Sequence, residues 1–146
     1  MIEEREFELD EFDQEDESWE ELESPEKTAF IAAIVRQNEA HADAEASLDE
    51  LERLADTAGI MVLGRYTQKR NQPERSTYFG RGWLNEIAEK MHQAQAELLI
   101  VNEELSPIQG RNIEKHFSIR VIDRTEVILS IFHDHARTRE ARLQVK

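Results

Sequence analysis

The stretch that decides the fold is TAFIAAIV, residues 28–35, an almost unbroken apolar run without a charged residue. A short run of this kind is typical of a strand buried on both faces, as the strands of parallel sheets are. Similar runs predict three more strands at 60–67, 97–101 and 118–122. Because helical segments separate them, we expect βαβ units with right-handed crossovers.

The first two helices are expected around local start and stop signals. Ser47 and Glu50 have the spacing of a capping box, which predicts a helix starting at Ser47. Gly59 lies where that helix would end in a left-handed cap. The second helix is expected to begin after Gly82.

The last two helices carry stronger signals. Ser106, Pro107 and Gln109 combine a capping serine, a proline at the first helical position and a capping-box glutamine. Asp123 and Glu126 form the next capping box, ahead of the helix that reaches the last residue. The predicted fold is therefore α/β, a small, open, mainly parallel four-stranded sheet flanked by helices.

The charge of the 146-residue chain is uneven. The net charge is −14, and residues 1–26 hold 14 acidic residues against one basic residue. This segment has too few apolar residues to offset the entropy of ordering, so we expect a disordered acidic tail. Residues 60–146 hold 14 basic and 11 acidic residues. The overall charge therefore does not exclude a nucleic acid partner.

The sequence gives no sign of export or membrane insertion. It has no cysteine, which excludes disulfides and thiolate metal sites. No run reaches the roughly 18 apolar residues of a membrane span, and the acidic N-terminus is unlike a signal peptide. We expect a cytoplasmic protein without a membrane span.

Catalytic and metal-binding motifs are missing. None of the five glycines begins a Walker A string, so the chain is not expected to be a P-loop enzyme, and no catalytic residue is predicted. His133 and His135 are two apart on an expected helix and point away from each other, so no metal site is predicted. Glu103 and Glu104 follow a strand end, where a small ligand or enzyme site is the alternative interpretation.

Two segments are candidates for binding anions. Gly80, Arg81 and Gly82 stand at the mouth of a helix, where backbone N–H groups favour a phosphate. The same glycines also suit a tight turn and close helix packing, which is the interpretation we favour. Near the C-terminus, Arg139, Arg142 and Lys146 fall at i, i+3 and i+7, with Arg137 close by. One helical face would thus present cations that can contact phosphates, or simply form an ordinary charged helix surface.

Three strings resemble the HflX family of GTPases. Residues 102–114, NEELSPIQGRNIE, are similar to the family's D-E-L-S-P-x-Q-x-R-N-L-E. Residues 121–145 are similar to V-I-D-R-T-x-L-I-L-D-I-F-A-x-R-A-R-T-x-E-x-K-L-Q-V, and YFGRG at 78–82 to Y-I-G-x-G-K. The likeness covers about 28–146. It departs at Trp83, where the family has Lys, at Ser130, where it has Asp, and at Asp134 and His135, where it has Gln-Arg.

The resemblance implies a domain organisation and a role. Residues 27–136 would be the HflX-type N-terminal α/β domain, and 137–146 the start of a helical hairpin leading to an absent GTP-binding domain. The full-length protein would bind GTP and Mg, whereas this chain would hold no cofactor. Its partners would be the large ribosomal subunit with its RNA and its own GTP-binding domain, in ribosome splitting or rescue. The alternatives are a nucleotide- or phosphate-binding domain using Gly80–Gly82, and an acidic interaction module using residues 1–26.

Overall fold

The computed structural model describes residues 27–145, with side chains as far as Asp134. The expected acidic tail and Lys146 lie outside these residues. Within this part of the chain, no helix has the length and apolar character needed to cross a membrane. Its elements are β1 Lys27–Val35, α2 His41–Thr57, β2 Ile60–Lys69, α3 Arg81–Ala94, β3 Leu98–Val101, α4 Pro107–Phe117, β4 Arg120–Asp123 and α5 Arg124–Val145.

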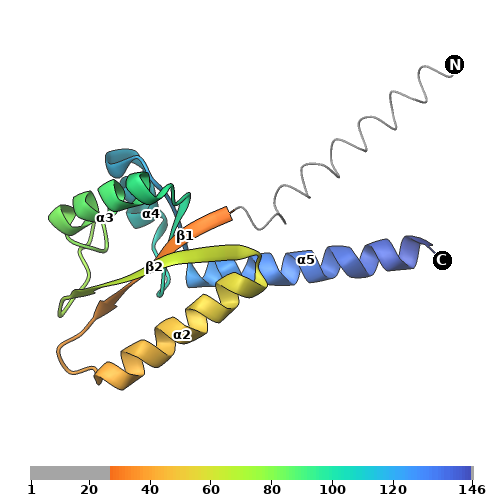
Figure 1. Ribbon diagram of the computed structural model, residues 1–146, viewed down its shortest axis with the longest axis horizontal. Helices are drawn as coiled ribbons and strands as arrows, with labels where there is room; N and C mark the ends of the chain where they lie inside the picture. Colours follow the sequence, from red (N-terminus) through yellow and green to blue (C-terminus); the bar gives the residue numbers. More distant parts are fainter. Residues whose placement is uncertain (1–26, 146) are drawn as a thin grey trace, which may run out of the picture.

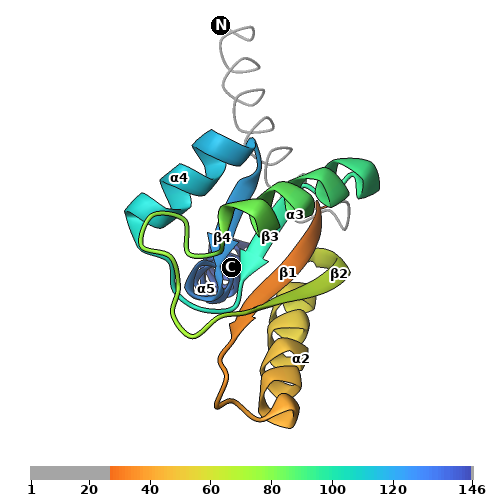
Figure 2. The same cartoon turned by 90° about the vertical axis from the view of Figure 1, so that its left-hand side faces the viewer.

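The four strands form one sheet in the order β2-β1-β3-β4, and every neighbouring pair is parallel (Figure 2). The predicted α/β fold class is confirmed. The chain leaves β1 toward β2 and then returns across β1 to reach β3. The strand order therefore reverses between β1 and β3, and this is the topological switch point of the sheet.

Helices cover both faces of the sheet, with α3 and α4 on one face and α2 and α5 on the other (Figures 1 and 2). Alternate residues of β1 serve the two cores: Phe30 and Ile34 pack toward α3 and α4, and Ile31 packs toward α2 and α5. Burial on both faces explains why residues 28–35 do not alternate in polarity.

The expected start of the first helix is wrong. α2 begins at His41 with Ala40 as N-cap, which places Ser47 inside the helix. There the Ser47 hydroxyl accepts a hydrogen bond of 2.8 Å from Asn102 Nδ2. Buried Ala44 extends the apolar face of α2 by one turn, and this packing outweighs the local capping signal. α3 likewise begins at Arg81, before Gly82 rather than after it.

The other helix boundaries agree with their signals. Gly59 takes a positive φ of 82° just after α2, as predicted. Ser106 Oγ accepts from the Gln109 N–H and Gln109 Oε1 accepts from the Ser106 N–H, both at 3.1 Å. Asp123 and Glu126 exchange the same pair of bonds at 3.0 and 3.3 Å. Both reciprocal capping boxes are confirmed.

Candidate functional site

The carboxyl ends of β1 and β3 meet at the switch point, which is where open parallel sheets bind ligands. Arg36 follows β1 and Glu103 follows β3, and their side chains form an ion pair of 3.3 Å. The Tyr78 hydroxyl, from the loop between β2 and α3, donates to the other Glu103 oxygen. The crevice is thus filled by a chain of three polar side chains.

Tyr78 is the least ordinary member of this group. It is only 3% exposed, and its φ of 64° lies in the left-handed region, which a bulky side chain rarely adopts. Burial first, and then the Glu103 carboxylate, raise the pKa of the phenol well above its ordinary value of 10.0. Tyr78 is therefore a neutral hydrogen-bond donor at physiological pH, and it holds its loop to the sheet.

The same loop is also held by α4. Gln109 Nε2 donates to the Glu74 carbonyl and Asn112 Nδ2 donates to the Ser76 carbonyl, both at 2.9 Å. Sequence reasoning missed this role of the 102–114 string. The available signal was the i, i+3 spacing of two amide side chains on one helix face. These polar residues position a loop and perform no chemistry of their own.

The Gly80–Gly82 turn lies at the start of α3. The Gly80 N–H is already used by Gln68 Oε1 at 3.0 Å, whereas Arg81 and Gly82 are exposed. α3 has no side-chain cap and no acidic residue in its first turn. A side chain at Gly82 would meet nothing within 4 Å, so glycine is not required there for packing. The anion-binding role of this turn stays a prediction.

Arg70, whose guanidinium lies beside Gly80, is already engaged. Arg70 forms an ion pair of 2.7 Å with Glu74 and donates to the Gln72 carbonyl. Lys69 instead lines a groove at the carboxyl ends of β1 and β2, together with Arg36. Because Arg36 and Arg70 are each paired with a carboxylate, the groove is not a concentrated positive site.

A second polar chain connects the switch point to the base of α5. Arg124 Nη1 donates to Asn102 Oδ1 at 3.0 Å, and Arg124 also pairs with Glu50 of α2. Asn102 in turn donates to Ser47. The first turn of α5 is therefore bonded both to the end of β3 and to α2.

The predicted RNA-contacting residues lie on the far part of α5. The helix backbone includes Arg137, Arg139 and Arg142 and runs through the expected boundary between residues 136 and 137. The side chains of these residues, and Lys146 as a whole, lie outside the described residues, so the assignment stays a prediction. α3 and α5 cover opposite faces, so the structure does not bring this segment together with the Gly80–Gly82 turn.

Among residues 27–134, no group of three or more His, Asp or Glu side chains is arranged to hold a metal ion. The switch point instead presents an ion pair and a neutral phenol, which suit positioning.

Comparison with known proteins identifies the family to which this chain belongs. The model of the family described as "GTP-binding GTPase N-terminal" matches residues 45–133, from α2 into α5. The protein named "GTPase HflX" of Alkalihalophilus pseudofirmus is 46% identical over 102 residues, which cover 70% of this chain and 24% of that protein. The chain belongs to the HflX GTPase family, as an N-terminal domain.

Other proteins named "GTPase HflX" are also similar to this chain. The protein from Caldanaerobacter subterraneus is 39% identical over 127 residues, 87% of this chain and 29% of its own length. The Escherichia coli protein is 41% identical over 99 residues, 68% of this chain and 23% of its own length. The chain thus spans about a quarter of the length of the curated HflX relatives it matches.

Solved structures show the same fold. A crystal structure of a mutation variant of SsGBP is similar with a TM-score of 0.58 and 26% identity, over 82% of this chain and 36% of that one. The SsGBP complex with GDP gives a TM-score of 0.56 at the same identity, over 82% of this chain and 32% of that one. The HflX-type strings quoted from the sequence correspond to the α4 segment and its loops and to β4 with α5.

Proposed function

We propose that this chain is the noncatalytic N-terminal domain of a longer GTP-binding protein that associates with the large ribosomal subunit. In this role it positions and regulates a GTPase domain, which binds GTP and Mg and hydrolyses the nucleotide. The names of the HflX relatives support the GTPase part of the proposal. We further propose that the protein works in the cytoplasm, where ribosomes are found.

The observation that carries the proposal is the way α5 leaves the α/β unit. Its first turn is fixed by the Asp123 cap and by Arg124, and Val127 is fully buried against the sheet. From there α5 continues as one helix to Val145 and extends past the sheet (Figure 1). A helix fixed at one end moves as a rigid rod, so it is a suitable link between this unit and a neighbouring domain.

The cations of α5 supply the proposed contact with ribosomal RNA. Arg137, Arg139 and Arg142 come after Val127 and Ile131, the described residues of α5 that pack in the core, and Lys146 follows them in the sequence. Phosphate contacts by such residues release counterions, so the affinity must fall as the salt concentration rises.

Co-sedimentation with purified large ribosomal subunits tests this function. We expect the 146-residue chain to co-sediment at low salt and to be released progressively as salt increases, because the contact is electrostatic. The triple variant Arg137→Ala, Arg139→Ala, Arg142→Ala should bind weakly at every salt concentration.

A matched control removes three exposed cations elsewhere: Arg53→Ala, Lys115→Ala and Arg120→Ala. This variant has the same net charge as the α5 variant and should bind as the wild type does. Equal losses in both variants, or binding that ignores salt, would contradict the assignment of the RNA contact to α5.

The second candidate is a phosphate-binding role for the Gly80–Gly82 turn, favoured by the uncapped and exposed start of α3. Calorimetry with GTP, ATP and inorganic phosphate discriminates the two. A carboxylate at the helix start repels an anion, and position 82 has open space, so Gly82→Glu should abolish such binding without disturbing the fold. Tight, Gly82-dependent binding would favour this candidate over a purely positioning role.

A further inference from the structure

The side of β2 that faces away from β1 has no neighbouring strand among the described residues, so it is an open edge of the sheet. β2 is ten residues long and pairs only with β1, so its alternate N–H and C=O groups point away from the sheet. Within residues 27–134, neither a strand nor a side chain makes a hydrogen bond to this edge. An edge of this length is ready to pair with another extended segment unless something protects it.

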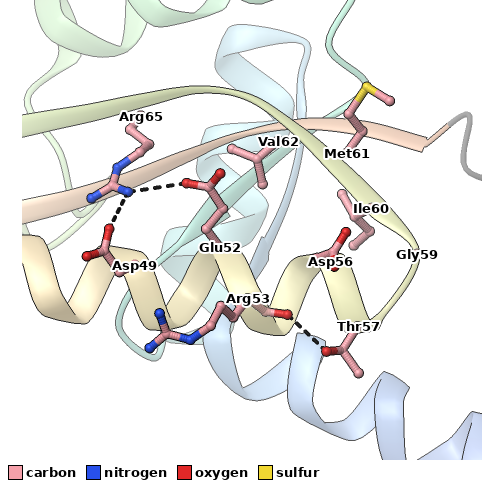
Figure 3. Close-up of a pocket in the computed structure, with 10 residues that line it drawn as sticks. All are labelled: Asp49, Glu52, Arg53, Asp56, Thr57, Gly59, Ile60, Met61, Val62 and Arg65. Carbon is pink, nitrogen blue, oxygen red and sulfur yellow. Dashed lines mark hydrogen bonds and ion pairs between the residues drawn. The ribbon is translucent and has the colours of Figure 1, made fainter.

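Carboxylates of α2 line the groove beside this edge. Figure 3 shows Asp49, Glu52 and Asp56 along the side of α2 that faces β2. Arg65 of β2 pairs with Asp49 and Glu52 at 2.6 and 3.2 Å, so part of their charge is neutralised. Asp56 lies nearer the start of β2 and its exposed carboxylate has no hydrogen-bond or ion-pair partner among the described residues.

The opposite side of the same strand end is apolar. Met61 and Leu63 are 53% and 41% exposed, although both are large hydrophobic residues. Figure 3 shows the Met61 side chain at the rim of the groove, on the other side of β2 from Val62. The pairing of β1 with β2 shifts register between Val62 and Gly64, which leaves Leu63 as a bulged residue. This end of β2 therefore has the acids of α2 on one side and the exposed Met61 on the other, with exposed Leu63 at the bulge between them.

We propose that the outer edge of β2 binds an extended protein segment in which basic residues alternate with apolar ones. The segment adds a fifth strand to the sheet, and its backbone pairs with the free N–H and C=O groups of β2. Because side chains of a strand alternate between faces, its basic residues meet Asp56, Glu52 and Asp49 while its apolar residues cover Met61 and Leu63.

Charge decides between this partner and a second copy of the chain. Residues 1–26 account for −13 of the net charge of −14, so the local charge beside β2 is what matters. Pairing two β2 edges would bring the carboxylates Asp49, Glu52 and Asp56 of two α2 helices together. A basic segment instead gains from the acids of α2. The same acids make the groove beside β2 unsuited to RNA.

Titration with a synthetic peptide tests the proposal on the full 146-residue chain. The probe is a nine-residue peptide of alternating lysine and valine, measured by calorimetry and by amide hydrogen exchange. We expect saturable binding and slower exchange of alternate β2 amides between residues 60 and 69, because those amides gain partners.

Two further peptides act as controls for the mode of binding. Methylating the backbone nitrogens of alternate residues keeps the charge but removes one row of N–H donors. Methylation of the row that faces β2 should abolish binding, whereas methylation of the other row should leave it intact. Equal binding of both methylated peptides would mean charge attraction alone, including attraction to residues 1–26, and would overturn the proposal.

Variants locate the site. Asp56→Lys should weaken binding of the lysine peptide by about threefold to tenfold, since an attraction becomes a repulsion. Glu86→Lys on α3 makes the same change of charge on the opposite face and should bind as the wild type does. Met61→Lys and Leu63→Lys should also weaken binding. Unchanged affinity in all three edge variants, or concentration-dependent dimerisation that competes with the peptide, would contradict the proposal.

Discussion

The two edges of the sheet differ in length and in protection. β4 has four residues, and the N–H groups of Val121 and Asp123 are taken by the carboxylates of Glu114 and Glu126, at 3.0 and 3.3 Å. β2 has ten residues, and no described residue covers its outer edge. A parallel sheet can thus close one edge with side chains from its own helices while the other is left for a partner.

The difference in protection between β4 and β2 follows from the helices that flank each strand. β4 lies between α4 and α5, so Glu114 of α4 and the capping-box residue Glu126 of α5 can accept from its free N–H groups. β2 ends in the loop held by Tyr78 and α4, and its edge faces the acids of α2 instead.

The largest effect is expected at the closed edge. Asp123 is 4% exposed and accepts hydrogen bonds from the N–H groups of Leu105 and Glu126. Asp123→Ala removes the N-cap of α5 and leaves two partly buried donors unpaired, so we expect the free energy of unfolding to fall by about 2 to 4 kcal/mol. Urea unfolding measures the loss. The control is Glu104→Ala, which removes an exposed carboxylate. An equal loss of unfolding free energy in this control would contradict the assignment of the effect to the Asp123 hydrogen bonds.

A smaller effect is expected at the open edge. Arg65 pairs with Glu45, Asp49 and Glu52, and its pKa is raised, chiefly by the hydrogen bond to Asp49. Arg65→Met leaves three carboxylates to repel one another, and we expect a loss of about 1 to 2 kcal/mol at low salt. The loss should shrink at high salt. Arg65→Lys should fall between the two, because it keeps the charge but loses the forked geometry.

The protection of β4 by Glu114 can be removed without touching the core. Glu114→Ala frees the Val121 N–H, and we expect a loss of about 1 kcal/mol with faster hydrogen exchange at that amide. Glu114→Gln keeps an acceptor oxygen and should preserve most of the protection. If the Val121 amide exchanges as slowly in both variants as in the wild type, a group other than Glu114 protects this edge.

The smallest effect at neutral pH concerns the switch point between the two edges. The pKa of Tyr78 is raised by folding, so in the unfolded state the phenol ionises first, near its ordinary value of 10.0. The stabilisation is therefore fully present below pH 10.0 and is lost as the pH rises above it.

Comparison of the wild type with Tyr78→Phe isolates this contribution, because lysine and arginine residues titrate equally in both proteins. Urea unfolding from about pH 8 to about pH 11 should show a steeper alkaline loss for the wild type. Parallel pH profiles would contradict the role of Tyr78 as a neutral donor to Glu103.

Much of the fold could be predicted from local signals. The run at residues 28–35 specified a strand buried on both faces, and the boxes at Ser106 and Asp123 marked two helix starts, because caps depend on residues three apart. Ser47 misled because its capping signal competes with the packing of Ala44, which lies one turn earlier. Long-range packing decided that boundary.

The candidate sites were less predictable. The 102–114 string was visible as a motif, yet its role in holding the loop at Glu74 and Ser76 depends on contacts more than 30 residues apart. The pairing of Tyr78 with Glu103 and Arg36 likewise joins three segments of the chain. Spacing along a sequence does not indicate which distant side chains come into contact.

By itself the sequence determined the class of fold, the parallel strands and the uneven charge, because polarity patterns and caps act over a few residues. Only the tertiary structure decided which strand lies at which edge and what covers it. Strand order is set by how crossovers pack on the two faces, and that depends on every helix at once. The closed β4 edge and the open β2 edge are consequences of that order, because the helices beside each strand decide which of its free N–H groups find a side-chain partner.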